Sequence, residues 1–115
     1  MIRYNKLGYV ELNVTDLARA RKFYEGMVGL QYVSRGATGE DYYRCSDDHH
    51  SVVLHQAPVA GLKRIGLMLA DDGQFAPLVQ SLDRFATPWE DVPDSECEKR
   101  HLGRALRMVE PHTKA

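Results

Sequence analysis

Apolar and polar residues alternate near the N-terminus, and the alternation then gives way to a helical spacing. Val10, Leu12 and Val14 are separated by Glu11 and Asn13, the period-2 pattern of a half-buried strand. The carboxylate of the next acidic residue can cap a helix, and apolar residues then recur every three or four positions until a glycine. Asp16 is the expected cap, and Gly29 is the terminating glycine. The expected buried face of the helix consists of Leu17, Ala20, Tyr24, Met27 and Val28.

The same strand, cap and helix pattern recurs 55 residues later. The shift places Leu12 on Leu67 and the capping Asp16 on Asp71. Apolar positions of the first helix then coincide with apolar positions of a second helix, which are Phe75, Leu78, Val79, Leu82 and Phe85. Agreement across strand, cap and helix in one register indicates an internal duplication.

Shorter strands follow each helix. After the first helix they are expected at 30–34, 40–45 and 51–55, which gives the order β-α-β-β-β. The second copy has a strand at 63–70, its helix, and further strands at 88–92 and 104–109, with a charged loop at 94–103. The prediction is an α+β fold of tandem βαβββ modules: a first module at 1–57, a linker at 58–62, and a second module at 63–115 that lacks its last strand.

Composition narrows the class of protein. The 115 residues carry a formal charge of −1, and no basic patch interleaved with aromatic residues is present, which argues against a nucleic-acid partner. The sequence has neither an apolar run of membrane-spanning length nor the apolar core of a signal peptide, so we expect no membrane partner and a cytoplasmic location. Cys45 and Cys97 have no metal or disulfide spacing, and we expect free thiols.

The opening motif resembles that of the vicinal oxygen chelate superfamily, which includes glyoxalase I, bleomycin-resistance proteins and type I extradiol ring-cleavage dioxygenases. Val14-Thr15-Asp16-Leu17 leads through Phe23-Tyr24 to Gly29-Leu30, as in that superfamily. The stretch from Tyr42 to His55 and the segment 61–66 look like the corresponding parts of the N-terminal domain of the extradiol enzymes.

The resemblance also locates the positions where a metal would be bound. In that superfamily the ligands come from the first strand of each module and from a glutamate on the last strand of the second. Those strand positions hold Tyr9 and Arg64 here, and the third lies beyond Ala115. Tyrosine is an infrequent ligand and arginine repels a cation, so we predict no metal in this chain. The resemblance then implies the metal-free N-terminal domain of an extradiol dioxygenase whose C-terminal domain holds Fe(II).

Several side chains are candidates for a concave face of the sheets. Five of them have the strand parity opposite to that of the helix-facing residues: Tyr9, Glu11, Asn13, Arg64 and Met68. In addition, His55 ends a strand, and Trp89 could stack on an aromatic ligand. A remnant ligand pocket is one interpretation, and a filled face with Glu11 paired to Arg64 is the favoured one. His55 is expected to be satisfied by backbone, and Trp89 to be a core residue. The adjacent His49 and His50 are expected in a hairpin turn, because neighbours on a strand face opposite ways and cannot chelate together.

Three functions remain open. The first is a structural domain that shapes the substrate channel of an extradiol dioxygenase, is not catalytic alone, and is either docked to the catalytic domain or part of a homo-oligomer. The second is a stand-alone protein of the bleomycin-resistance type that binds a small aromatic or apolar ligand as a dimer. The third, a glyoxalase-like metal isomerase, is disfavoured by Tyr9 and Arg64.

Overall fold

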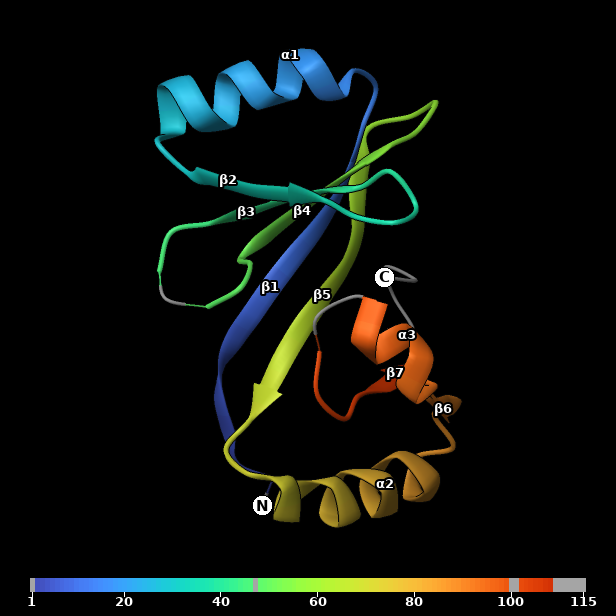
Figure 1. Ribbon diagram of the computed structural model, residues 1–115. Coiled ribbons are helices and arrows are strands. Elements are labelled where there is room, and N and C mark those ends of the chain that lie inside the picture. The colour runs from blue at the N-terminus through green and yellow to red at the C-terminus, as the bar shows by residue number, and fades with distance from the viewer. Residues whose placement is uncertain (1, 47, 100–101, 109–115) are drawn as a thin grey trace. The chain divides into compact units, whose positions relative to one another are not determined.

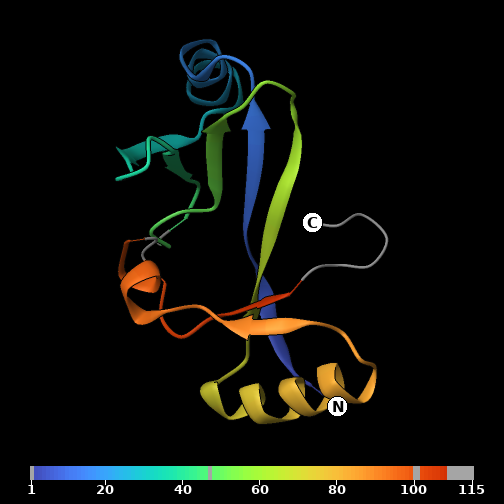
Figure 2. The same ribbon diagram turned by 90° about the vertical axis from the view of Figure 1, so that its right-hand side faces the viewer.

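The computed structural model describes residues 2–46, 48–99 and 102–108 and has an α+β fold, as the sequence predicts (Figures 1 and 2). In chain order its elements are β1 (Tyr4–Val14), α1 (Leu17–Arg21), the π-helix η1 (Lys22–Val28), β2 (Gln31–Arg35), β3 (Asp41–Arg44), β4 (Val52–Gln56), β5 (Gly61–Leu69), the 3-10 helix η2 (Asp72–Gln74), α2 (Phe75–Arg84), β6 (Trp89–Asp91), α3 (Asp94–Lys99) and β7 (Leu106–Met108). The chain forms two compact units, described separately: residues 8–66 make the first unit, and residues 1–7 with 67–115 make the second.

A five-stranded sheet organises the first unit. Its strand order is β2-β3-β4-β1-β5, with β1 parallel to β4 and with β3 antiparallel to both β2 and β4. The parallel register pairs Glu11 with Val53 and Asn13 with His55. Alternate residues of β1 and β4 therefore share one face of the sheet, while α1 and η1 cover the other (Figure 1). The predicted β-α-β-β-β order of the first module is present.

The first helix begins and ends as predicted, but its predicted buried face is wrong in the second half. Asp16 accepts a hydrogen bond from the amide of Arg19, and Gly29 closes the helix with a φ of 84°. Met27 is 81% exposed and Val28 is 52% exposed. The winding changes from α to π after Arg21, which lowers the rotation per residue, so a stripe counted at the α-helical period no longer stays on one side.

The core of the first unit lies between this helix and the sheet. Tyr43 and Leu54 are fully buried, and the Tyr43 ring contacts those of Tyr24 and Tyr32. Asp41 is also fully buried. Its carboxylate accepts two hydrogen bonds from the Arg35 guanidinium, at 2.8 and 3.1 Å, and this bidentate pairing compensates the burial of a charge.

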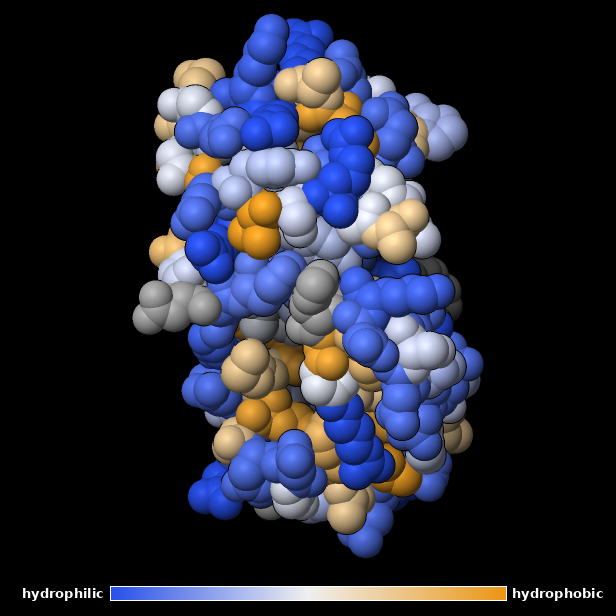
Figure 3. Space-filling model, viewed as in Figure 1, coloured by the Kyte–Doolittle hydropathy of each residue, from blue (hydrophilic) through white to orange (hydrophobic). Residues whose placement is uncertain are grey.

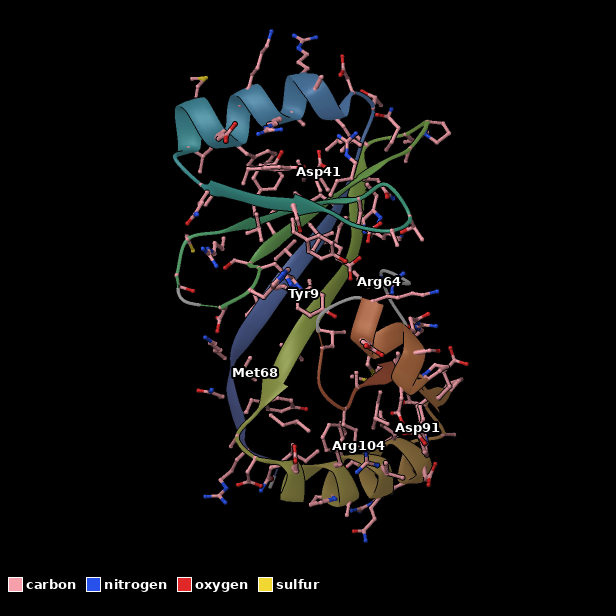
Figure 4. The ribbon with its side chains drawn as sticks, viewed as in Figure 1. Tyr9, Asp41, Arg64, Met68, Asp91 and Arg104 are labelled. Atoms are coloured by element: carbon pink, nitrogen blue, oxygen red, sulfur yellow. The ribbon has the colours of Figure 1, made fainter. Side chains whose placement is uncertain are left out.

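The second unit is built around α2. Phe75, Leu78 and Leu82 of this helix are buried, as the repeat predicts, and the Arg104 guanidinium lies 4.4 Å from the Phe75 ring centroid (Figure 4). The strands β6 and β7 pair in an antiparallel manner, as β2 and β3 do in the first unit. The expected strand residue Val109 lies outside the described residues.

Three expectations for the second unit are wrong. The charged stretch expected to be a loop contains α3, which has no amphipathic stripe because only Cys97 of its six residues is buried. Asp71 precedes η2 but makes no side-chain capping bond, and its carboxylate lies 3.7 Å from the Arg3 guanidinium instead. Phe85 is 73% exposed because α2 ends one residue before it.

None of the described helices combines the length and apolar character needed to cross a membrane. Both cysteines are free thiols, with Cys45 exposed and Cys97 buried.

Tyr43 provides a test of the core. Its hydroxyl is buried and has no hydrogen-bond partner among the described residues, and burial raises the pKa of Tyr43 from about 10 to about 12. Removing an unsatisfied hydroxyl should leave the free energy of unfolding of Tyr43→Phe unchanged, or raise it by up to about 1 kcal/mol.

The pH dependence has a definite sign. Between pH 10 and about 12 the unfolded chain releases the Tyr43 proton while the folded chain keeps it, so stability falls as pH rises. Urea denaturation across this range should show a smaller fall for Tyr43→Phe than for the wild type. The exposed Tyr4→Phe should behave like the wild type. A Tyr43→Phe variant destabilised by more than about 1 kcal/mol would show that the hydroxyl has a partner.

Candidate functional site

A buried carboxylate lies on the sheet face opposite the first helix. Glu11, in the C-terminal half of β1, is 1% exposed, since the alternation that directs Val10 and Leu12 toward the helix turns Glu11 to the other side. The parallel register places His55 of β4 beside it on the same face. Burying a carboxylate is costly unless it is paired, so the contacts of Glu11 decide what this face can do.

His55 makes the shortest of these contacts. Its Nε2 lies 2.7 Å from Glu11 Oε1, and its Nδ1 lies 3.5 Å from Lys63 Nζ. A carboxylate only accepts and an ammonium only donates, so Nε2 carries the imidazole proton and Nδ1 accepts from Lys63. The expectation that backbone satisfies His55 is therefore wrong, because a carboxylate on the neighbouring strand does so.

Arg64 completes the cluster from β5, with its Nε 3.6 Å from Glu11 Oε2. The Glu11 side chain is 2% exposed and that of Arg64 is 32% exposed, so the cation reaches solvent while the anion does not. The structure thus contains the Glu11–Arg64 pair of the favoured interpretation. We refer to Glu11, His55, Lys63 and Arg64 as the carboxylate cluster.

Tyr9 occupies the other position that the resemblance associates with a metal ligand. It lies beside β5 near Arg64 (Figure 4). Its ring covers Gly66, where any Cβ would collide with it, and it contacts the His50 ring at a centroid distance of 5.0 Å. A glycine is required at position 66 because the tyrosine ring fills the space of a side chain there.

A second buried carboxylate, Glu40, lies at the start of β3. Burial alone would raise its pKa, but hydrogen bonds from the Thr38 hydroxyl, from its own backbone and from the Tyr42 hydroxyl outweigh that effect. His55 also acts to lower the pKa of Glu40, which therefore lies below its ordinary value. Specific partners therefore favour the charged form of Glu40.

The remaining candidates are distributed between the two units. Asn13 is half-buried on β1 in the first unit, in register with His55. Met68 and Trp89 belong to the second unit. Met68 is 40% exposed and its sulfur accepts from the Asn5 amide. Trp89 is only half-buried, not a core residue as expected, and its indole N–H donates to Asp83 at 2.8 Å.

The chemistry of the cluster favours self-neutralisation over metal binding. Within residues 2–46, 48–99 and 102–108, no three or more His, Cys, Asp or Glu side chains converge as a metal would require. A metal at Glu11 and His55 would have to displace two cations, Arg64 and Lys63, that already lie beside them. The cluster instead links three strands, β1, β4 and β5, through the hydrogen bond between His55 and Glu11 and the Arg64–Glu11 ion pair.

Sequence reasoning missed two parts of this face. Lys63 was assigned no role, and Glu40 was not separated from the other residues of its strand. Strand parity could have identified Glu40, because it places Glu40 on the same face as Tyr42 and opposite to Asp41 and Tyr43. Lys63 gave no signal, because its parity differs from that of Arg64 and only the length of its side chain brings it to His55.

Comparisons with known proteins assign the class. The family model of the Glyoxalase/Bleomycin resistance protein/Dioxygenase superfamily matches residues 6–102, so this chain belongs to that superfamily. It is similar to biphenyl-2,3-diol 1,2-dioxygenase of Sphingomonas paucimobilis, with 26% identity over 96% of this chain and 37% of the relative. It is also similar to metapyrocatechase of Pseudomonas sp. (strain CF600), with 29% identity over 90% of this chain and 34% of the relative.

Solved structures agree with the sequence relatives. The fold matches a catechol 2,3-dioxygenase with a TM-score of 0.88 at 28% identity, over 96% of this chain and 37% of that protein. An extradiol ring-cleaving dioxygenase from B. fuscum matches with a TM-score of 0.79 at 27% identity, over 96% of this chain and 30% of that protein. The chain spans about a third of the length of these dioxygenases.

The carboxylate cluster predicts an unequal response of two glutamates. Glu11→Gln conserves volume but removes the carboxylate that pairs with Arg64 and accepts from His55, and it should lower the free energy of unfolding by about 2 kcal/mol. Glu25→Gln is the matched control, because Glu25 forms an exposed pair with Arg21 at 3.1 Å and should cost less than about 0.5 kcal/mol. Urea denaturation at neutral pH measures both, and equal losses would contradict the structural role of Glu11.

Proposed function

We propose that this chain is the N-terminal, non-catalytic domain of an extradiol ring-cleavage dioxygenase. The observation that carries the proposal is the pattern of the comparisons, in which dioxygenases match nearly the whole chain over only about a third of their own length. The rest of such a protein would hold the Fe(II) centre, and this domain would shape the approach of a catechol-like aromatic substrate.

The carboxylate cluster supports a non-catalytic role for this part. An Fe(II) centre of the facial type needs two imidazoles, a carboxylate and open coordination positions. At the strand positions that the resemblance associates with ligands, this chain has the Tyr9 ring packed on Gly66 and the Arg64 guanidinium beside Glu11. Both side chains hold the sheet together, and neither offers a vacant donor of the required type.

Exposed apolar side chains support a further partner. Phe23, Met27 and Val28 on the first helix and Ile65 on β5 are each about half exposed or more. Apolar side chains also reach the surface shown in Figure 3. These exposed apolar side chains suit docking to a catalytic domain or to another copy of the chain. The enzyme would be cytoplasmic.

The module boundaries at 1–57 and 63–115 are part of the same proposal. In the first module the strand after the antiparallel pair β2–β3 returns to lie parallel to β1. The second module has the corresponding pair β6–β7.

A comparison of two polypeptides tests the proposed function. The first is the 115-residue chain, and the second is the product of the uncut reading frame that contains it. Supplied with Fe(II) and O₂, the longer protein should convert catechol or biphenyl-2,3-diol to a coloured ring-opened product, and the 115-residue chain should not.

Two controls and two contrary outcomes complete this experiment. Circular dichroism should show that the short chain is folded, and omission of Fe(II) should abolish turnover by the long one. Turnover by the short chain alone would place catalysis within it. A reading frame that ends near Ala115 and yields a tight dimer that binds small aromatic molecules would favour the binding-protein alternative.

A further inference from the structure

The His55 imidazole bridges a carboxylate and an ammonium that belong to different strands. Its Nε2 lies 2.7 Å from Glu11 Oε1 on β1, and its Nδ1 lies 3.5 Å from Lys63 Nζ on β5. Because β1 separates β4 from β5 in the sheet, the contact with Lys63 ties together two strands that are not neighbours. This contact needs the lone pair of a neutral ring, since an ammonium can only donate.

Protonation of His55 affects its two contacts in opposite ways. In the imidazolium both ring nitrogens donate, so Nδ1 presents an N–H to the Lys63 ammonium, and two positive charges lie 3.5 Å apart. The bond from Nε2 to Glu11 instead gains a cationic donor, and hydrogen bonds with an ionised donor are the stronger ones. The protonated ring is therefore retained by Glu11 and repels Lys63.

The charged groups around His55 single out Lys63 as the group that responds. Both signs face the ring: Glu11 on β1, Glu40 at the start of β3, and Lys63 and Arg64 on β5. The carboxylates favour a positive ring and the cations oppose it. Of the two cations, Lys63 contacts the ring itself, whereas Arg64 lies beside Glu11.

Two further titratable rings, His49 and His50, lie on the same face of the sheet. They are in the connection between β3 and β4, as expected, and both meet the Tyr42 ring, at centroid distances of 5.6 and 4.9 Å. Tyr42 is paired with Val53 of β4, two residues before His55. The helices α1 and η1 cover the opposite face (Figure 1). Protonation must therefore be followed ring by ring to assign an effect to His55.

Lys63 can leave the imidazole at little structural cost. The residue is half-buried, and its charged end sits on a flexible four-carbon stem, so rotations about side-chain bonds can carry the ammonium into solvent. His55 has no such freedom, because its ring is short and is bonded to Glu11, which is 1% exposed. The repulsion is therefore relieved by movement of Lys63.

From this geometry we infer that the contact between His55 and Lys63 is an acid-released latch. Protonation of His55 at Nδ1 frees the Lys63 ammonium and leaves the bond between His55 and Glu11 in place, and deprotonation closes the latch again. The tie between β4 and β5 thus depends on pH in the interval of about pH 5–8 where imidazoles titrate. The inference concerns residues of this chain alone and does not depend on the proposed function.

NMR of the 115-residue chain between about pH 8 and about pH 5 tests the latch. The ring nitrogens of His55 and the ε-methylene protons of Lys63 are followed in the same samples. As Nδ1 of His55 gains its proton, the nuclear Overhauser contacts between the ring and Lys63 should disappear with the same pH midpoint, while the Nε2–H signal should remain that of a hydrogen-bonded proton. Contacts to Lys63 that persist after Nδ1 is protonated, or loss of the Nε2 bond first, would overturn the inference.

Three variants assign the effect to this pair. Lys63→Met removes the charge and should raise the pH midpoint of His55 protonation by at least about 0.3 unit, about a twofold change in proton affinity. Lys22→Met is the matched control, because Lys22 is exposed on η1, and it should leave that midpoint unchanged. In His55→Gln, Lys63 should show no step in this pH range. Equal midpoints in Lys63→Met and the wild type, or a Lys63 step that survives in His55→Gln, would refute the latch.

Discussion

The fold of the first unit depends on neutralising one buried carboxylate. Glu11 lies on β1, the strand between β4 and β5 in the sheet, where it is almost completely buried. It is stable there only because His55 donates to it from one neighbouring strand and Arg64 approaches it from the other. The same two contacts link β1 to both of its neighbouring strands, so charge compensation and sheet geometry are one constraint.

This constraint also determines which chemistry the sheet face can support. Histidine and glutamate are among the commonest metal ligands. Here the Nε2–H of His55 donates to Glu11, the Nδ1 lone pair of His55 faces Lys63, and Arg64 lies beside Glu11. A domain of this superfamily can therefore keep the architecture of a metal-binding module while its inner face serves stability.

Much of the fold could be predicted from local pattern. Period-2 alternation found the first strand, and β-forming residues between turn signals found the others of the first module. Asp16 and Gly29 marked its helix, and the repeat identified the core residues of α2. The failures arose where a local rule did not apply. π-Helical winding exposed Met27 and Val28, and α3 buries too little to show an apolar period. In the site, parity paired Glu11 with Arg64, but the cross-strand bond to His55 depends on the β1–β4 register, which the sequence does not encode locally.

The proton position on the His55 ring tests the central claim most directly. Nitrogen NMR of the imidazole at neutral pH distinguishes the two tautomers. If Glu11 and Lys63 hold His55 as described, the proton resides on Nε2 and the Glu11→Gln substitution changes the Nε2 signal more than the Nδ1 signal. A ring protonated on Nδ1, or one indifferent to the loss of Glu11, would contradict a sheet built around this carboxylate.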